Sequence, residues 1–136
     1  MGRMNLPGMH RFTLLLASNK DATVNMATAK KRLDAYFNHS LNWSDLHESQ
    51  AYGDNNPTTP RYLNAICQGQ TSLTLTDVTA WLKTLETEMG RQRGAAANGQ
   101  VTIDLDVVVW DDRVLRPNDA GRSYYQVCLA DLASAD

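Results

Sequence analysis

Two aspartates towards the C-terminal end of the chain have the spacing of a metal-binding pair. Asp104 and Asp106 are separated by one residue in the apolar run from Val101 to Trp110. On a β-strand, residues two apart point to the same face, so the two carboxylates are expected side by side. Neighbouring carboxylates repel each other unless a cation neutralises them, and Mg²⁺ binds such oxygens together with water and phosphate. The alternative is a solvent-exposed face that the aspartates only keep soluble. The apolar residues expected on the opposite face are Ile103, Leu105, Val107 and Val109.

Two arginines shortly before this strand carry the charge that phosphate binding requires. Arg91 and Arg93 follow Gly90 at the end of a predicted helix. A guanidinium can bind two phosphate oxygens at once, so beside a Mg²⁺ pair these arginines are candidate phosphate ligands. A cation at a helix C-terminus also stabilises the helix dipole, and this structural explanation stays open.

Aromatic and amide side chains suggest a binding site for a flat heterocycle. Tyr62 and Asn64 share one face of a predicted strand, which places a ring beside an amide that both donates and accepts hydrogen bonds. Tyr124 is a second candidate ring. The alternative is that Tyr62 packs at the edge of the core and Asn64 satisfies a backbone group. The histidines are scattered over different predicted elements and are assigned no chemistry: His10, His39 and His47.

The elements that must position these residues follow from hydrophobic periodicity. A helix with Thr76 as N-cap is the clearest. Its apolar residues recur at helical spacing: Val78, Trp81, Leu82, Leu85 and Met89. The loop Gly53–Pro60 is a candidate lid, and Gly69 is a candidate bulge. The predicted strands are Arg11–Ala17, Trp43–Tyr52 (weak), Tyr62–Leu73 and Val101–Trp110, the last of them central. The predicted helices are Thr23–Phe37, Thr76–Arg93 and a short C-terminal one, Ser123–Leu132.

This order predicts an α+β fold. Strand, helix, strand, strand, helix, strand is the βαββαβ pattern of a ferredoxin-like sandwich, in which one antiparallel sheet carries helices packed on it. The 136 residues are expected to form one domain over residues 11–136, with residues 1–10 as a lead-in outside the fold.

Composition excludes some classes of function. A net charge of −2 argues against a protein held to nucleic acid or to a membrane by bulk charge. Cys67 and Cys128 lack metal-ligand spacing and are expected to be reduced thiols. No apolar run approaches the length of a signal-peptide core or a transmembrane helix, so the cytoplasm is the expected compartment.

The residues from about Phe12 to Leu132 resemble the 6-hydroxymethyl-7,8-dihydropterin pyrophosphokinases, enzymes of folate biosynthesis that transfer pyrophosphate from ATP to a pterin alcohol. No single motif is specific, but five occur in the family's order. They are Ala17-Ser18-Asn19, Tyr62-Leu63-Asn64-Ala65, Leu85-Glu86 with Gly90-Arg91-Gln92-Arg93, Thr102-Ile103-Asp104-Leu105-Asp106, and Arg122-Ser123-Tyr124 with Leu129 after it.

The resemblance implies a role for each matching residue. Asp104 and Asp106 are expected to hold two Mg²⁺ ions that bridge the phosphates of ATP, the co-substrate. The other implied residues fall into three groups: Arg91 and Arg122 as catalytic phosphate contacts, Glu86 and Arg93 as nucleotide-binding residues, and Tyr62, Asn64 and Tyr124 as pterin-binding residues. The expected partners are therefore small molecules rather than nucleic acid or membrane, and the expected state is a monomer.

Two elements of the family are missing. The family's Trp-Gly-Pro-Arg is replaced by Asn98-Gly99-Gln100-Val101, and its Pro-His element by the shorter Leu115–Gly121, which has no His. One hypothesis is therefore an active but slow enzyme, in which Arg93, Arg113 or Arg116 substitutes electrostatically. The other is a degenerate paralogue that binds a pterin or nucleotide without turnover. An RNA-binding domain is disfavoured because the central strand is acidic.

Overall fold

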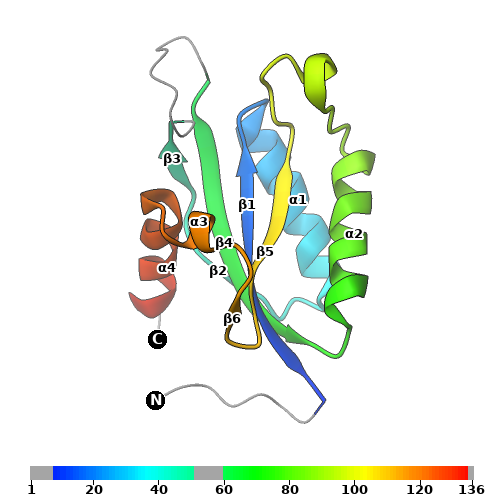
Figure 1. The fold of residues 1–136 in the computed structure, drawn as a ribbon, viewed down its shortest axis with the longest axis vertical. Coiled ribbons are helices and arrows are strands. Elements are labelled where there is room, and N and C mark those ends of the chain that lie inside the picture. The colour runs from blue at the N-terminus through cyan, green and yellow to red at the C-terminus, as the bar shows by residue number, and fades with distance from the viewer. Residues whose placement is uncertain (1–7, 51–59, 135–136) are drawn as a thin grey trace.

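One antiparallel sheet organises the molecule. The computed structural model describes residues 8–50 and 60–134, and in them six strands pair in the order β2-β4-β1-β5-β6, with β3 also paired to β4 (Figure 1). All the pairings are antiparallel, so the predicted α+β fold with an antiparallel sheet is confirmed. The strands are β1 (His10–Ser18), β2 (Asn42–Trp43), β3 (His47–Ser49), β4 (Tyr62–Thr71), β5 (Asp104–Trp110) and β6 (Arg113–Val114).

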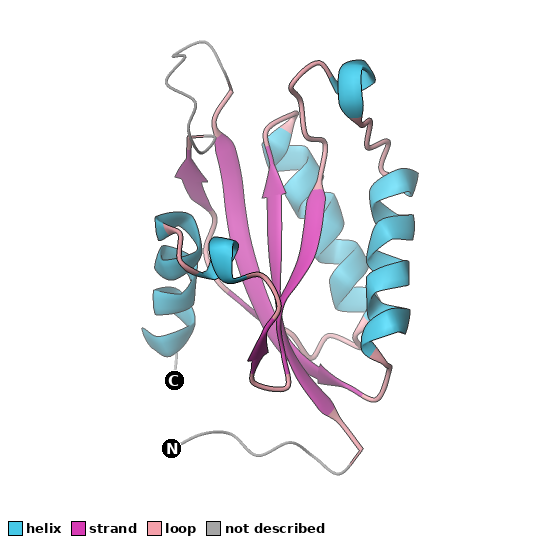
Figure 2. Ribbon diagram, in the orientation of Figure 1, coloured by secondary structure: helices cyan, strands magenta, loops and turns pink. Residues whose placement is uncertain are grey.

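Helices cover both faces of the sheet and make three layers (Figure 2). One face packs against α1 (Ala22–Tyr36) and α2 (Leu75–Glu88) and holds the larger apolar core. The other packs against α4 (Ser123–Ser134), with the short α3 (Pro117–Ala120) beside it. Alternation along β1 explains why its middle is a continuous apolar run: Leu14 and Leu16 belong to the first core and Leu15 to the second.

The second predicted helix begins slightly earlier and ends earlier than expected, at Leu75 and Glu88. The Thr74 side chain, rather than that of Thr76, caps α2 by accepting a hydrogen bond from the Asp77 amide at 3.1 Å. At the other end α2 stops at Glu88, and Gly90 takes a φ of +91° that favours glycine. The helix therefore ends just before Gly90, as the position of this glycine predicted, and the predicted bound at Arg93 is wrong. Gly90 turns the chain out of the helix and towards β5.

The strand that carries Asp104 was predicted to be central, but another strand covers only one end of its outer edge. β5 starts at Asp104 rather than Val101, and it pairs with β1 along its length but with β6 only at Val109 and Trp110. The register with β1 shifts between Thr13 and Leu14, which inserts an extra residue, Val108, into β5. This bulge turns both Val108 and Val109 towards α4, so the predicted placement of Val109 with the other core is wrong.

Gly69 does not mark a bulge. β4 pairs with β1 without a register shift from Thr71 to Leu63. A Cβ on Gly69 would lie 2.7 Å from Leu41 Cδ2 and 3.1 Å from Phe12 Cζ. Close approach of two apolar side chains therefore explains this glycine.

The remaining predicted elements need small corrections. The weak strand Trp43–Tyr52 is two short strands, β2 and β3, on the outer side of β4. β1 begins at His10, the last residue of the predicted lead-in. Residues 1–7 lie outside the described residues, as does the predicted lid apart from Pro60. The buried cysteines Cys67 and Cys128 are free thiols.

Candidate active site

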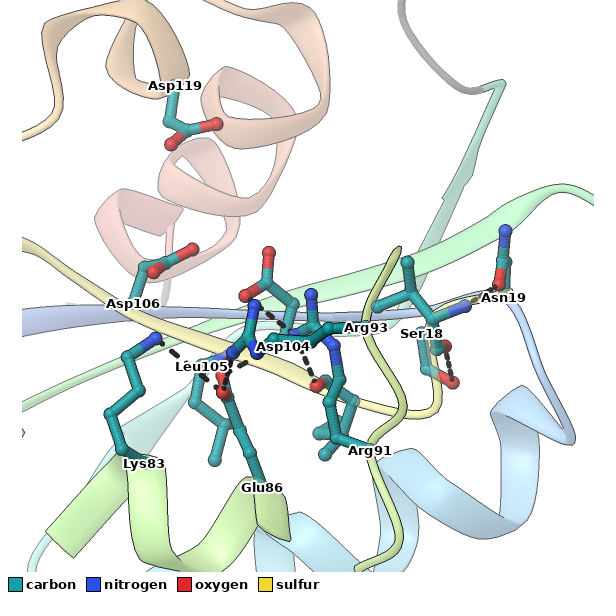
Figure 3. A network of polar contacts seen from close by, with 12 residues as sticks. Ser18, Asn19, Lys83, Glu86, Arg91, Arg93, Asp104, Leu105, Asp106 and Asp119 are labelled. Atoms are coloured by element: carbon teal, nitrogen blue, oxygen red, sulfur yellow. Dashed lines mark hydrogen bonds and ion pairs between the residues drawn. The ribbon is translucent and has the colours of Figure 1, made fainter. Parts of the chain in front are cut away.

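Asp104 and Asp106 share the α4 face of the sheet, as alternation along the strand predicts (Figure 3). The Asp104 side chain is 37% exposed, whereas that of Asp106 is only 13% exposed. Burial, followed by repulsion from the Asp104 charge, raises the pKa of Asp106 to about 6, although Arg116 and Lys83 oppose the shift. An exposed, merely solubilising face is therefore excluded for Asp106. The pair carries an electrostatic strain that a bound cation would relieve.

Glu86 is the buried centre of the ion cluster beside this pair. Its side chain is 1% exposed and rises from α2 towards β5 (Figure 3). One oxygen, Oε2, accepts from the Leu105 amide at 2.8 Å, so it binds the backbone between the two aspartates. The other, Oε1, accepts from Arg93 Nη2 at 2.8 Å and lies 3.5 Å from Lys83 Nζ. Both carboxylate oxygens predicted to contact a nucleotide are thus occupied by the protein itself.

Arg91 connects α2 to the first aspartate. After the turn at Gly90, its Nη1 donates to the Ile103 carbonyl at 2.8 Å and to Asp104 Oδ1 at 3.2 Å. The same nitrogen lies 3.6 Å from Glu86 Oε2. The guanidinium therefore faces β5, which excludes helix capping as its main role. Arg91 Nε is buried without a hydrogen-bond partner among the described residues, which is unfavourable in this arrangement.

A cavity of about 310 Å³ opens beside Asp104 on the α4 face. It brings together four predicted residues from three separate segments: Tyr62, Asn64, Asp104 and Tyr124. Asp119 closes part of the wall, and the remaining lining residues are Leu15, Ala17, Ser49 and Gln50. The predicted heterocycle-binding residues and one predicted metal ligand thus share one space.

The Asn64 amide is held firmly in the floor of this cavity. Its side chain is buried, and Nδ2 donates to the His47 carbonyl at 3.0 Å and to Ser49 Oγ at 2.8 Å. The alternative prediction for Asn64, that its amide satisfies a backbone group, is therefore confirmed. Because Nδ2 is occupied in this way, the orientation of the amide is determined before any ligand binds.

The ring of Tyr124 is fixed by a residue that the sequence did not suggest. The Tyr124 hydroxyl donates to Asp119 Oδ1 at 2.6 Å, and burial together with this hydrogen bond raises the Tyr124 pKa. Asp119 Oδ2 in turn accepts from Arg116 Nε at 2.6 Å. Arg122 lies two residues before Tyr124, and its charge acts to lower the Tyr124 pKa.

The Ser18-Asn19 motif has a structural role at the end of β1. Asn19 Oδ1 accepts from the Val101 amide at 2.6 Å, and Nδ2 donates to the Gly99 carbonyl at 3.3 Å. Ser18 Oγ donates to the carbonyls of Lys20 and Val101. These bonds fix the segment that leads into β5, and with it the position of Asp104.

Two residues of the site were missed by sequence reasoning. Lys83 precedes Glu86 by three residues on α2, and this helical spacing was a usable signal for an ion pair. Asp119 stands in the first turn of a helix that starts with Pro117, which is a weaker signal because acids are common there. A further cavity, of about 400 Å³, contains none of the predicted site residues and lies around Arg11, Thr13 and Gln68.

A comparison with known protein families confirms the resemblance found in the sequence. A family model described as 7,8-dihydro-6-hydroxymethylpterin-pyrophosphokinase (HPPK) matches residues 13–134, nearly the whole chain. The chain belongs to this family. As a family, HPPK proteins are ATP-dependent pyrophosphokinases of folate biosynthesis that bind a pterin and use Mg²⁺. The comparison with curated proteins found no match.

The donor set fits the Mg²⁺ that HPPK proteins use. In residues 8–50 and 60–134, no group of three or more His, Cys, Asp or Glu side chains is arranged to hold a metal ion. Asp104 and Asp106 offer two carboxylates, which fits Mg²⁺ because this ion usually completes its coordination with waters and phosphates. In the same described part of the chain, no helix combines the length and apolar character needed to cross a membrane.

Proposed function

We propose that this protein transfers pyrophosphate from ATP to 6-hydroxymethyl-7,8-dihydropterin in a Mg²⁺-dependent and slow reaction. The hydroxyl oxygen of the pterin alcohol forms a bond to the β-phosphorus of ATP, and the bond from that phosphorus to the α–β bridging oxygen breaks. AMP leaves, and the hydroxyl proton is released to solvent. Such transfers depend on positioning and charge neutralisation more than on covalent catalysis by the protein.

The observation that carries the proposal is that Asp104 belongs both to the cavity and to the aspartate pair. This carboxylate lines the cavity with Tyr62, Asn64 and Tyr124, and it is also half of the pair with Asp106. A pterin held in the cavity would therefore lie next to phosphates held at the aspartate pair. The short distance between two substrates is the main requirement of a reaction between them.

The proposed roles divide between the two parts of the site. Asp104 and Asp106 would hold Mg²⁺, which when bound neutralises the negative charge of the phosphate oxygens. The rings of Tyr62 and Tyr124 would stack on the pterin, and Asn64 would hydrogen-bond its edge. Phosphate contacts are proposed for Arg91, Arg93 and Arg122. For Arg91, a ligand-induced shift would also give its buried Nε a partner.

The slow rate is proposed because the loop before β5 carries no charge. The segment Gly94-Ala95-Ala96-Ala97-Asn98-Gly99-Gln100 includes a short 3₁₀ helix, η1 (Gly94–Ala97), and has no cationic side chain. A preorganised donor or cation at a developing charge typically contributes about 10²–10³ in rate. The loss of such a cation predicts slow turnover rather than none.

The uncharged loop also favours a second candidate function, a protein that binds the pterin or the nucleotide without turnover. The residues that would bind both ligands are present, while the loop that would supply a cation to the reacting phosphates lacks one.

AMP formation from ATP and the pterin alcohol in the presence of Mg²⁺ tests the proposal. We expect turnover that Asp104→Asn lowers at least about 100-fold, as loss of a metal ligand does. The matched control is Asp112→Asn at the turn after β5, which carries the same chemical change on a carboxylate 80% exposed and outside the cavity. Turnover that is equal in the native protein and in Asp104→Asn would contradict the metal role. Absent turnover with retained pterin binding would favour the second candidate.

A further inference from the structure

A chain of three contacts joins the wall of the cavity to the aspartate pair. The Tyr124 hydroxyl donates to Asp119 Oδ1 at 2.6 Å. The Arg116 guanidinium donates through Nε to Asp119 Oδ2 at 2.6 Å. The same Nε lies 3.7 Å from Asp106 Oδ2. Asp119 is thus placed between the residue that would stack on the pterin and the residue that would bind Mg²⁺.

We propose that Asp119 is a positioning residue that couples the two halves of the site, because one oxygen holds the Tyr124 ring and the other holds the Arg116 guanidinium against Asp106. This inference rests on the proposed function, since it assigns the pterin to the Tyr124 side and the nucleotide to the Asp106 side. Neither the family match nor the sequence motifs assigned a role to Asp119.

The geometry of Asp119 suits two simultaneous partners. Its side chain is 20% exposed, while that of Arg116 is 48% exposed, so the carboxylate is the more constrained partner of the ion pair. Pro117 begins α3 two residues earlier, and its restricted φ helps to fix where Asp119 lies. In Figure 3, Asp119 extends from α3 towards Asp106 on β5. A short and rigid element therefore presents the carboxylate.

Arg116 is important because its guanidinium faces Asp106 of the aspartate pair. Its Nε lies 3.7 Å from Asp106 Oδ2, so it is a resident counter-charge of the aspartate pair. About half of its side chain remains exposed, so part of this arginine is accessible from solvent to a phosphate group. An arginine held here by Asp119 would add positive charge next to a bound triphosphate.

Two ligand titrations test the coupling. The probes are 6-hydroxymethylpterin and the Mg²⁺ complex of α,β-methylene-ATP, whose α–β bond resists transfer. We expect Tyr124→Phe to weaken pterin binding about 3- to 10-fold without affecting the nucleotide, as loss of one hydrogen bond does. Arg116→Gln is expected to weaken the nucleotide about 10-fold without affecting the pterin. Asp119→Asn should weaken both. A loss confined to one ligand, or to neither, would overturn the proposal.

Urea unfolding tests the coupling without any ligand. Tyr124 and Arg116 are joined through Asp119. The double variant should therefore shift the unfolding midpoint by less than the sum of the shifts in the two single variants. In the Asp119→Asn background the two shifts should add. Additive shifts in both backgrounds would show that Asp119 does not link the two side chains.

The binding results distinguish a failure of this inference from a failure of the proposed function. A native protein that binds neither probe contradicts the proposed function and removes the coupling role with it. A native protein that binds both probes, together with an Asp119→Asn variant that binds both equally well, overturns the coupling role alone.

Discussion

The two faces of the sheet are built differently. The face under α1 and α2 holds the larger core, in which residues such as Leu14, Leu82 and Leu85 are almost fully buried. The face under α4 has a smaller apolar cluster and leaves part of β1 and β4 open as the 310 Å³ cavity. The larger apolar core and the cavity proposed to bind ligands thus lie on opposite sides of the same strands. Glu86 lies between them, because it belongs to α2 but bonds the strand that carries the aspartates.

The strongest test of this contrast compares one leucine from each face. Leu82 on α2 is 1% exposed, so Leu82→Ala leaves a cavity and should lower the free energy of unfolding by about 3–5 kcal/mol. Leu129 on α4 is only half-buried against the smaller cluster. Leu129→Ala is expected to lower it by about 1 kcal/mol. Urea unfolding measures both, and equal losses would contradict the division between the faces.

The next effect concerns Glu86. Glu86→Gln removes the charge that Lys83, Arg91 and Arg93 share and should lower the free energy of unfolding by about 2–3 kcal/mol. The loss is below that for a fully buried cluster, because Lys83 and Arg93 are 50% and 61% exposed and can turn to water.

The matched control lies two residues away on the same helix. Glu88 pairs with Arg32 on the surface, and both side chains are almost half exposed. Glu88→Gln should therefore change stability by less than about 1 kcal/mol. If both glutamate variants lost the same amount, burial of Glu86 would have no energetic consequence.

The smallest expected effect has the opposite sign. The pKa of Asp106 is raised to about 6, above that of an unfolded aspartate, so the folded state binds this proton more tightly. The folded protein is therefore destabilised as the pH rises from about 4 through 6, and the penalty is complete near pH 7. Asp106→Asn should increase metal-free stability near pH 7 by about 1 kcal/mol and have little effect near pH 4.

Added Mg²⁺ sharpens this last comparison. Saturating Mg²⁺ with ATP should stabilise the native protein, because ligands that bind the folded state shift the unfolding equilibrium. The Asp106→Asn variant should gain less. Asp112→Asn, on the exposed turn, should behave as the native protein does at each pH. A native protein less stable than Asp106→Asn even with Mg²⁺ and ATP would contradict the metal role of Asp106.

Local sequence patterns were sufficient to predict much of the architecture. Alternation predicted that Asp104 and Asp106 share a face, and helical spacing predicted the core residues Val78, Leu82 and Leu85 of α2. These features depend only on the geometry of one strand or one helix. The antiparallel sheet followed from the order of the elements.

The features that were not predicted depend on contacts between elements that are far apart in the sequence. The bulge at Val108 exists only in the pairing with β1, so alternation within β5 alone placed Val109 on the wrong face. The role of Glu86 depends on β5 approaching α2, and periodicity does not show that a helical carboxylate will be buried. Asp119 likewise becomes significant only when Tyr124 and Arg116 meet it in space.

The outer edge of β5 has a consequence beyond catalysis. Between Asp104 and Val108 no strand covers this edge in the described structure, yet three backbone groups along or beside it have other partners. Glu86 accepts from the Leu105 amide, Arg91 donates to the Ile103 carbonyl, and the Leu115 amide donates to the Val108 carbonyl. Uncovered strand edges recruit other chains and promote aggregation. Glu86 and Arg91 thus occupy backbone groups that a strand of another chain would otherwise pair with, and this role does not depend on turnover.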